Sequence, residues 1–188
     1  MKGIRKLCDE EGILMICDEV QCGMGRTGAM FAWQAYDIKP DIMSMAKAIG
    51  SGIPVGAFAM TEEVAKYSLE PGDHGTTYGG NPLACTAVSK TIEIFEKKHL
   101  VEHVQKVGAY LTKKLEELVE EYDTVKAVKG KGLMQGIQVT KPISEITGAA
   151  LKEGLLIIGA GSDVIRFVPP LIIELEQVDE MIRILKKA

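Results

Sequence analysis

The order of apolar and polar positions divides the first half of the chain into short apolar runs separated by polar loops. Residues 1–11 place apolar side chains at helical spacing, and the continuous apolar run 13–17 that follows predicts a buried strand. Two more strands are expected at 42–45 and 55–60, with a short helix over 30–36 before them. Continuous apolar strands that alternate with helices are typical of a largely parallel sheet, so this part of the chain predicts an α/β layer.

The second half has longer helical periodicities and shorter strands. A polar, glycine-containing loop over 70–82 leads to a helix, for which Asn81 is the expected cap and Pro82 the first residue. A long amphipathic helix is expected at 99–122. Further elements follow: strands at 125–128, 133–139, 155–158 and 164–168, and helices at 143–153 and 176–187. This pattern predicts a small α+β domain over 98–188, after a larger domain over 1–97.

Composition and charge exclude several classes of protein. The 188 residues carry a formal net charge of -4 that is mixed along the chain, which argues against a nucleic-acid surface. No apolar stretch is long enough to span a bilayer, and no secretory signal is expected. The four cysteines form no C-x-x-C pair, which favours reduced thiols in a cytoplasmic protein. His99 and His103 lack a third ligand nearby, so we expect no metal site.

Two of the apolar runs end in residues that can carry chemistry. Asp18 follows the first run, and Lys47 follows the run 42–46. If the two strands are neighbours, they bring a carboxylate and an amine to one edge of the sheet. Pyridoxal phosphate fits such a pair, because its ring nitrogen binds a carboxylate and its aldehyde binds a lysine. The alternatives are an aspartate that caps a loop or pairs with Arg26, and a lysine that extends into solvent.

Other candidates lie outside these two strand ends. Gln21 and the glycines after it can place amide donors beside the same ring, or can simply form a turn. Thr76 and Thr77 lie in the glycine-containing loop, where hydroxyls and backbone amides suit a phosphate; a solvated loop is the alternative. Arg166 lies inside an apolar strand and should have a carboxylate partner, from a substrate or from an internal Asp or Glu.

These residues stand in motifs that together resemble the class III (ornithine-type) pyridoxal-phosphate aminotransferases. The first motif reads Ile-Cys-Asp-Glu-Val-Gln at 16–21. The others, in order, lie at 23–28, 40–47, 74–84, 130–134 and 165–171, so the resemblance covers essentially the whole chain. The loop Pro-Gly-Asp-His-Gly-Thr-Thr-Tyr at 71–78 most resembles the acetylornithine aminotransferases of arginine biosynthesis.

The resemblance implies the aspartate-aminotransferase fold (fold type I), with part of a large α/β domain and a small C-terminal domain. It also implies a role for each candidate. Lys47 is the lysine that binds the cofactor aldehyde, and Asp18 pairs with the ring nitrogen. Val20 packs on the ring and Gln21 contacts its hydroxyl side, while Thr76 and Thr77 bind phosphate and Arg166 binds the substrate α-carboxylate. Thr77 would reach the cofactor of a neighbouring subunit, which implies a homodimer.

The implied reaction is the transfer of an amino group from N-acetylornithine to 2-oxoglutarate, which yields N-acetylglutamate semialdehyde and glutamate. Ornithine and 4-aminobutyrate aminotransferases are the alternatives within the family. Family members are about twice as long as this chain, and their N-terminal half carries the glycine-rich phosphate cradle and the aromatic residue that stacks on the ring. A catalytically incompetent C-terminal fragment is therefore a further alternative, and we expect the 188 residues alone to bind the cofactor weakly.

Overall fold

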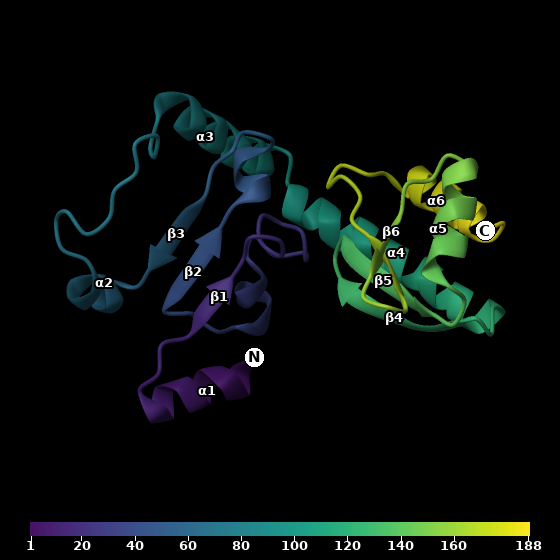
Figure 1. Cartoon of the computed structure of the whole chain (residues 1–188), viewed down its shortest axis with the longest axis horizontal. Coiled ribbons are helices and arrows are strands. Elements are labelled where there is room, and N and C mark those ends of the chain that lie inside the picture. Colours follow the sequence, from purple (N-terminus) through teal and green to yellow (C-terminus); the bar gives the residue numbers. More distant parts are fainter. The chain divides into compact units, whose positions relative to one another are not determined.

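The computed structural model describes residues 1–188, which divide into two compact units (Figure 1). Unit 1 contains Met1–Gly25 and Ala29–Leu100, and unit 2 contains Arg26–Gly28 and Val101–Ala188. None of the helices combines the length and the apolar composition that crossing a lipid bilayer requires.

Unit 1 is built on a three-stranded sheet with the order β1-β2-β3. Strand β1 (Ile16–Asp18) runs parallel to β2 (Ile42–Met45), and β3 (Ala57–Met60) runs antiparallel to β2. The helices of the unit are α1 (Lys2–Glu11), α2 (Glu62–Ser68) and α3 (Pro82–Lys97), with 3-10 helices η1 (Ala32–Tyr36) and η2 (Lys47–Gly50). The two apolar runs of the sequence thus form neighbouring parallel strands, as their pattern predicts.

Local interactions explain where these elements begin and pack. The Asn81 side chain accepts a hydrogen bond from Ala84 N–H at 3.0 Å, so it caps α3 as expected. Met15, Cys17 and Ile38 form a small buried cluster of unit 1. Helix α1 contributes no buried residue, so its amphipathic pattern is not matched by burial within the described chain.

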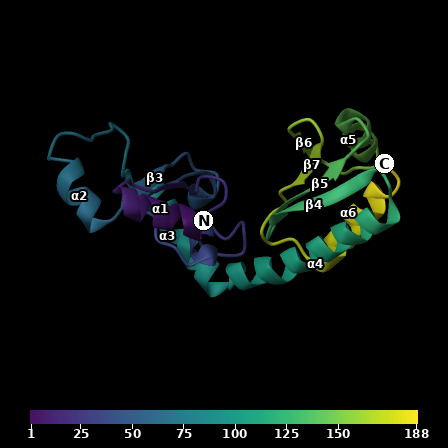
Figure 2. The same cartoon turned by 90° about the horizontal axis from the view of Figure 1, so that it is seen from below.

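Unit 2 is a four-stranded antiparallel sheet covered by helices. The strand order is β4-β5-β7-β6, with β4 (Val125–Lys131), β5 (Met134–Val139), β6 (Ile158–Ala160) and β7 (Val164–Phe167). The helices are α4 (Leu100–Glu121), α5 (Ile143–Lys152) and α6 (Leu175–Leu185). Helices α4 and α6 run beneath one face of the sheet (Figure 2), and the core between them includes Leu111, Leu115 and Ile165.

Two expectations about elements are corrected by the structure, and one helix was not expected. Strand β1 begins at Ile16, so Ile13 and Leu14 lie outside it and are exposed. The strand expected at 155–158 lies instead at Ile158–Ala160, because the short turn at Gly161 (φ +70°) pairs these residues with β7, while Leu155 and Ile157 pack on the core. Helix α2 was missed, because it is short and only Val64 is buried.

Candidate active site

The carboxyl ends of β1 and β2 bring two of the predicted residues to one edge of the sheet. Asp18 is the last residue of β1 and lies opposite Ser44 of β2. Lys47 follows two residues after the end of β2 and opens the 3-10 helix η2. Because β1 and β2 are adjacent and parallel, both residues lie at the carboxyl edge of the sheet.

The carboxylate of Asp18 is held through one of its oxygens. Oδ1 accepts hydrogen bonds from Val20 N–H (2.9 Å) and from the Ser44 hydroxyl (3.3 Å). Oδ2 has no intramolecular hydrogen bond. The side chain is exposed, although the apolar run before it predicts a buried strand. The bond to Val20 shows that Asp18 does cap the following loop, while its second oxygen is available to an N–H group of a ligand.

Lys47 has an exposed side chain and an unusual backbone. Its φ is +50°, in the left-handed region that non-glycine residues rarely adopt. Such a conformation is strained by about 1–2 kcal/mol relative to glycine, and strained residues cluster at functional sites. The Lys47 side-chain nitrogen has no ion pair or hydrogen bond within the chain, so no protein group occupies it.

The loop after β1 is fixed by an acid that sequence reasoning missed. Glu19 is only 3% exposed, and its carboxylate accepts hydrogen bonds from Ala32 N–H (2.9 Å) and Trp33 N–H (3.0 Å). An acidic residue directly after a buried strand was the available signal. Val20 is half-buried and Gln21 is exposed, so the turn that Glu19 fixes leaves both beside the Asp18 strand end.

Thr76 and Thr77 are both exposed, in the loop between α2 and α3. The loop is linked to the sheet through His74, whose ring meets that of Phe58 edge to face at a centroid distance of 5.4 Å. Phe58 lies opposite Ser44, which in turn lies opposite Asp18. Asp18, Ser44 and Phe58 therefore form a row across the three strands. This row connects Asp18 with His74, which lies in the same loop as Thr76 and Thr77.

Arg166 belongs to unit 2 and has no carboxylate partner. It lies in the middle of β7, between Gly136 of β5 and Ile158 of β6. Its Nε is buried without a hydrogen-bond acceptor, which is unfavourable for a guanidinium group. The internal Asp or Glu that the sequence left open is therefore not present, and Arg166 instead lines a largely apolar pocket of about 380 Å³.

Arg26 does not pair with Asp18, contrary to one alternative from the sequence. Its guanidinium donates to the carbonyl oxygens of Leu133 (3.0 Å) and Pro169 (2.6 Å) within unit 2. Burial lowers the pKa of Arg26 from its ordinary value. Arg26 thus holds the backbone three residues beyond Arg166, and Asp18 has no basic side chain as an ion-pair partner.

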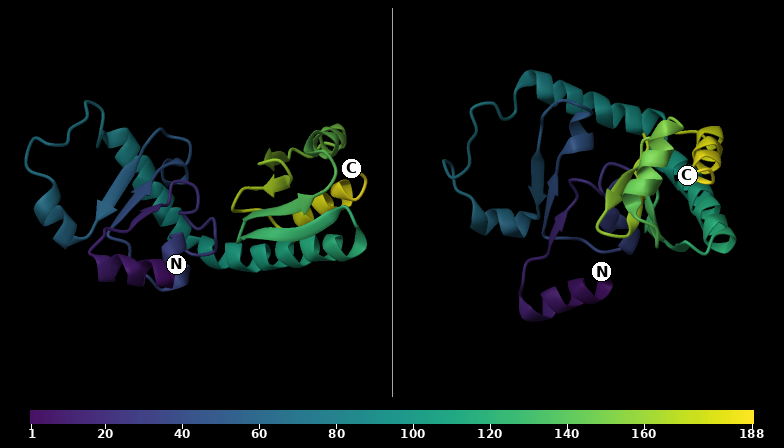
Figure 3. Two further views of the ribbon diagram at one scale, coloured as in Figure 1. Left: turned by 60° about the horizontal axis from the view of Figure 1, so that its bottom comes forward. Right: turned by 45° about the vertical axis from the view of Figure 1, so that its right-hand side comes forward.

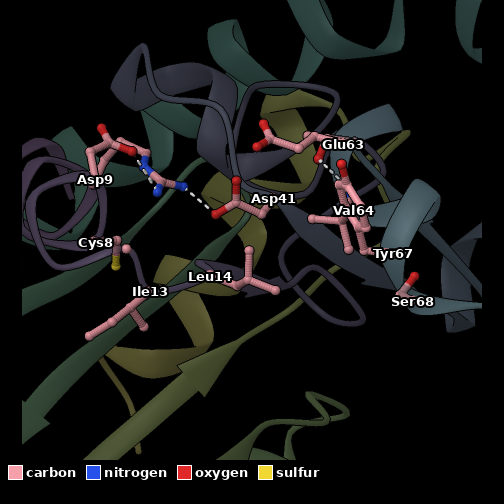
Figure 4. A pocket seen from close by; sticks show the side chains of 12 residues that line it. Cys8, Asp9, Ile13, Leu14, Asp41, Glu63, Val64, Tyr67 and Ser68 are labelled. Carbon is pink, nitrogen blue, oxygen red and sulfur yellow. Dashed lines mark hydrogen bonds and ion pairs between the residues drawn. The ribbon is translucent and has the colours of Figure 1, made fainter.

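A separate hollow of about 400 Å³ lies where α1, the start of β2 and α2 meet (Figure 4). Asp9 and Asp41 flank the Arg5 guanidinium there, at 2.7 and 2.6 Å. Burial opposes ionisation of Asp41, but hydrogen bonds from Arg5 and Met15 N–H hold its pKa below the ordinary value. These charges compensate each other and no predicted site residue lines the hollow, so we do not assign the chemistry to it.

The chemistry of these side chains fits pyridoxal phosphate. An aspartate with one oxygen fixed and the other unpaired can accept the ring N–H, and an amine without a partner can bind the aldehyde. The unpaired Nε of Arg166 fits a carboxylate ligand for the same reason.

Comparison with solved structures identifies the class of protein that this arrangement defines. The ornithine δ-aminotransferase of Plasmodium falciparum superposes with a TM-score of 0.92 at 34% identity, over 100% of this chain and 49% of that one. The acetylornithine aminotransferase of Elizabethkingia anophelis gives a TM-score of 0.91 at 32% identity, over 99% of this chain and 48% of that one. The α/β fold of the chain is therefore that of part of an aminotransferase, as the resemblance implies.

Sequence comparison gives the family. The model of the class III aminotransferases matches residues 1–188, and the chain belongs to this family. It is 47% identical over 185 residues to the acetylornithine aminotransferase of Methanocaldococcus jannaschii, which covers 98% of this chain and 46% of that protein. The corresponding enzyme of Clostridium acetobutylicum is 44% identical over 189 residues, 100% of this chain and 49% of that protein. The chain thus spans about half the length of the curated relatives it matches.

Proposed function

We propose that the chain supplies the cofactor lysine and the ring carboxylate of a pyridoxal-phosphate aminotransferase. One observation carries the proposal: Asp18 and Lys47 lie at the carboxyl ends of neighbouring parallel strands, at one edge of the sheet. Family membership supports it, because the motif that contains each residue lies within the matched region.

Each residue has a defined task in this proposal. Bound pyridoxal phosphate supplies an aldehyde for amines and a protonated ring that withdraws electrons from the reacting carbon. Asp18 would hold the ring N–H through its unpaired Oδ2 and so keep the ring protonated, while Oδ1 remains bonded to Val20 N–H and the Ser44 hydroxyl. Lys47 Nζ would take a proton from the substrate carbon that carries the amino group, as a general base, and would return a proton as a general acid.

The remaining candidates orient ligands. Val20 packs on the ring, and Gln21 contacts its hydroxyl side. Thr76 and Thr77 bind phosphate, with Thr77 acting on the neighbouring subunit of a homodimer; their full exposure is compatible with binding to a second chain. Arg166 binds the α-carboxylate of the substrate, and its unpaired Nε supports this role.

N-acetylornithine is the amino donor that we propose, with 2-oxoglutarate as acceptor. The similar acetylornithine aminotransferases, at 44–47% identity, support this choice. Ornithine is the second candidate, because the ornithine δ-aminotransferase structure superposes as closely as the acetylornithine enzyme. 4-Aminobutyrate is a third donor within the family.

The first test uses the visible absorption that the cofactor gains when it binds a lysine. Pyridoxal phosphate added in excess to the chain should produce this band, weakly because the chain spans half of its relatives' length. Lys47→Ala should abolish the band, whereas Lys39→Ala, a matched change at another exposed lysine of unit 1, should leave it unchanged. A band of full strength in Lys47→Ala would contradict the assignment of the lysine.

The donor is tested in a single turnover with the same preparation. Addition of N-acetylornithine should remove the visible band faster than equal concentrations of ornithine or 4-aminobutyrate. Faster loss with ornithine would replace the proposed donor and leave the assignment of Lys47 intact.

A further inference from the structure

The loop 168–174 forms one wall of the pocket that contains Arg166. It joins strand β7 to helix α6, which are the yellow-green and yellow elements at the end of the chain (Figure 3). The residues of this loop that line the pocket are Val168, Pro169, Pro170 and Ile173. The shape of the pocket therefore depends on the interactions that hold the loop.

The hydrogen-bond ladder between β5 and β7 stops where this loop begins. Val139 N–H donates to Asp163 O (2.8 Å), so the odd-numbered residues of the two antiparallel strands form the hydrogen-bonded pairs. The last regular pair of this kind is Gln135 with Phe167, and the next in the same register is Leu133 with Pro169. Proline has no N–H group, so Pro169 cannot donate to Leu133 and the ladder ends there.

Arg26 supplies the donors that the ladder lacks at this point. Its Nη1 donates to Leu133 O (3.0 Å) and to Pro169 O (2.6 Å), the carbonyl oxygens of the pair that proline interrupts. Leu133 N–H in turn donates to Arg26 O (2.9 Å). Arg26 therefore joins the ends of both strands through one side-chain nitrogen and its own backbone.

The segment 26–28 fits closely against the rest of unit 2. A Cβ on Gly132 (φ +59°) would lie 2.5 Å from the Thr27 carbonyl carbon and 2.7 Å from Arg26 O, so only glycine allows this approach. Gln105 Nε2 donates to Gly28 O (2.6 Å) at the other end of the segment. Arg26 has no carboxylate partner, and burial lowers its pKa. A desolvated charge that binds only backbone carbonyls is costly, which argues for a task beyond packing.

The far end of the loop has an anchor of its own. His103 Nε2 lies 2.9 Å from Ile173 O, within hydrogen-bonding distance. Ile173 N–H donates to Pro170 O (3.1 Å), and the two prolines restrict the backbone between the anchors because each fixes its own φ. The loop is therefore held at Ile173 near α6 and at Pro169 near β7, where the anchor is the Arg26 guanidinium.

We infer that Arg26 is a positioning residue of the Arg166 pocket. Its guanidinium replaces the backbone donor that Pro169 lacks, and so holds the loop 168–174 as the wall of the pocket. Without this group the carbonyl oxygens of Leu133 and Pro169 lose their donor, and the β7 end of the loop is released. The consequence for a substrate rests on the proposed role of Arg166, whereas the consequence for the loop does not.

Hydrogen exchange of the cofactor-free chain tests whether Arg26 holds the loop. Arg26→Met removes the donors and keeps an unbranched side chain, so the amides of Leu133 and Ile173 should exchange at least about tenfold faster. Arg26→Lys keeps a charged donor on a slightly shorter side chain and should restore part of the protection. Gln105→Met is the matched control, because it removes a bond to the same segment but none to the loop, and should change these rates by less than about twofold.

Two results of the exchange experiment would overturn the inference. One is an unchanged rate at Ile173 in Arg26→Met. The other is an equal increase in Gln105→Met, or an equal increase throughout β4, because either would report general destabilisation of unit 2 instead of release of the loop.

Calorimetric titration of the cofactor-free chain with 2-oxoglutarate tests the consequence for the pocket. Arg26→Met should weaken binding by about fivefold or more, Arg26→Lys should recover part of the loss, and Gln105→Met should stay within about twofold of the unaltered chain. Faster loop exchange with unchanged affinity would make Arg26 a structural residue only and would contradict the inference. If the unaltered chain does not bind 2-oxoglutarate, or Arg166→Met binds it equally well, the proposed role of Arg166 fails, and the exchange rates alone decide whether Arg26 holds the wall.

Discussion

Lys47 combines a free amine with a backbone conformation that its residue type disfavours. Met24, Asp37, Ser51 and His99 also have a positive φ, so the strain supports a role for Lys47 only together with its place at the strand end. The position of Lys47 after an apolar run could be predicted from the sequence, because strand ends are readable from patterning. Its positive φ could not, because it depends on how η2 turns away from β2.

The strain leads to a stability prediction. Lys47→Gly should be more stable than Lys47→Ala by roughly 1 kcal/mol, because only glycine adopts a positive φ without a steric penalty. Urea unfolding of the two variants measures the difference. At Lys39, which has no positive φ, the order should reverse and glycine should be the less stable choice. Equal stability of the two Lys47 variants would show that the backbone there is unstrained.

The cysteines differ strongly in their expected reactivity. Burial, followed by the hydrogen bond and charge of Glu19, raises the pKa of Cys22 to about 11. At pH 8 only about one Cys22 side chain in a thousand is therefore a thiolate, the form that reacts with alkylating agents. Burial also raises the pKa of Cys17, whereas Cys85 is exposed.

Iodoacetamide at pH 8 should accordingly modify Cys85 at least about 100-fold faster than Cys22. Peptide mass spectrometry over time measures both rates, and in urea the two rates should become similar. Comparable rates in the folded chain would show that Glu19 and burial do not control the Cys22 thiol.

At the scale of elements, α1 is attached to the sheet mainly through charge. Arg5 on α1 donates to Asp41, which also accepts the Met15 N–H at 2.6 Å and so joins the starts of β1 and β2. The pKa of Asp41 is lowered in the folded chain, so its ionised carboxylate contributes fully to the free energy of unfolding at pH values above the ordinary carboxyl range. That stabilisation is lost as the pH falls through the lowered pKa.

Asp41→Asn should therefore lower the free energy of unfolding at pH 7 by about 1 kcal/mol. This is the contribution of a charge-assisted hydrogen bond, reduced because the ion pair is partly exposed. The difference from the wild type should shrink as the pH falls through the lowered pKa of Asp41, because the carboxylate then becomes protonated. Denaturant unfolding at pH 7 and at a series of acidic pH values measures it. Asp9→Asn, which removes the more exposed partner of Arg5, should have a smaller effect. A difference that persists at low pH would assign the loss to packing instead.

Most elements could be predicted because their patterns are strong. The long helix α4 has buried residues at helical spacing, Val104, Val107, Leu111 and Leu115, and the expected range of 99–122 differs from the observed one by one residue at each end. Strand β6 was misplaced, because its register depends on the turn at Gly161 and not on hydrophobicity. Leu155 and Ile157 pack on the core, so the apolar residues 155–157 gave a strand pattern although they lie outside the strand.

For the whole molecule, the sequence motifs predicted the family and the aminotransferase fold, and both are confirmed. The motifs also supplied the candidate site residues, most of which stand at a strand end or in a loop; their roles stay predictions. The missing carboxylate partner of Arg166 and the bonds of Arg26 to Leu133 and Pro169 could not be predicted. Both depend on which groups meet after the chain has folded.

The central claim is that Lys47 is the residue that binds the cofactor aldehyde. The most direct measurement is a borohydride treatment, which makes a bond between lysine and aldehyde permanent. The chain is mixed with pyridoxal phosphate and the remainder of the M. jannaschii enzyme (the part that this chain does not match), treated with borohydride and analysed by peptide mass spectrometry. The account predicts a pyridoxyl-phosphate label on the peptide that contains Lys47, and far less on Lys39 or the other lysines of the chain. A label spread evenly over exposed lysines, or concentrated at another one, would contradict it.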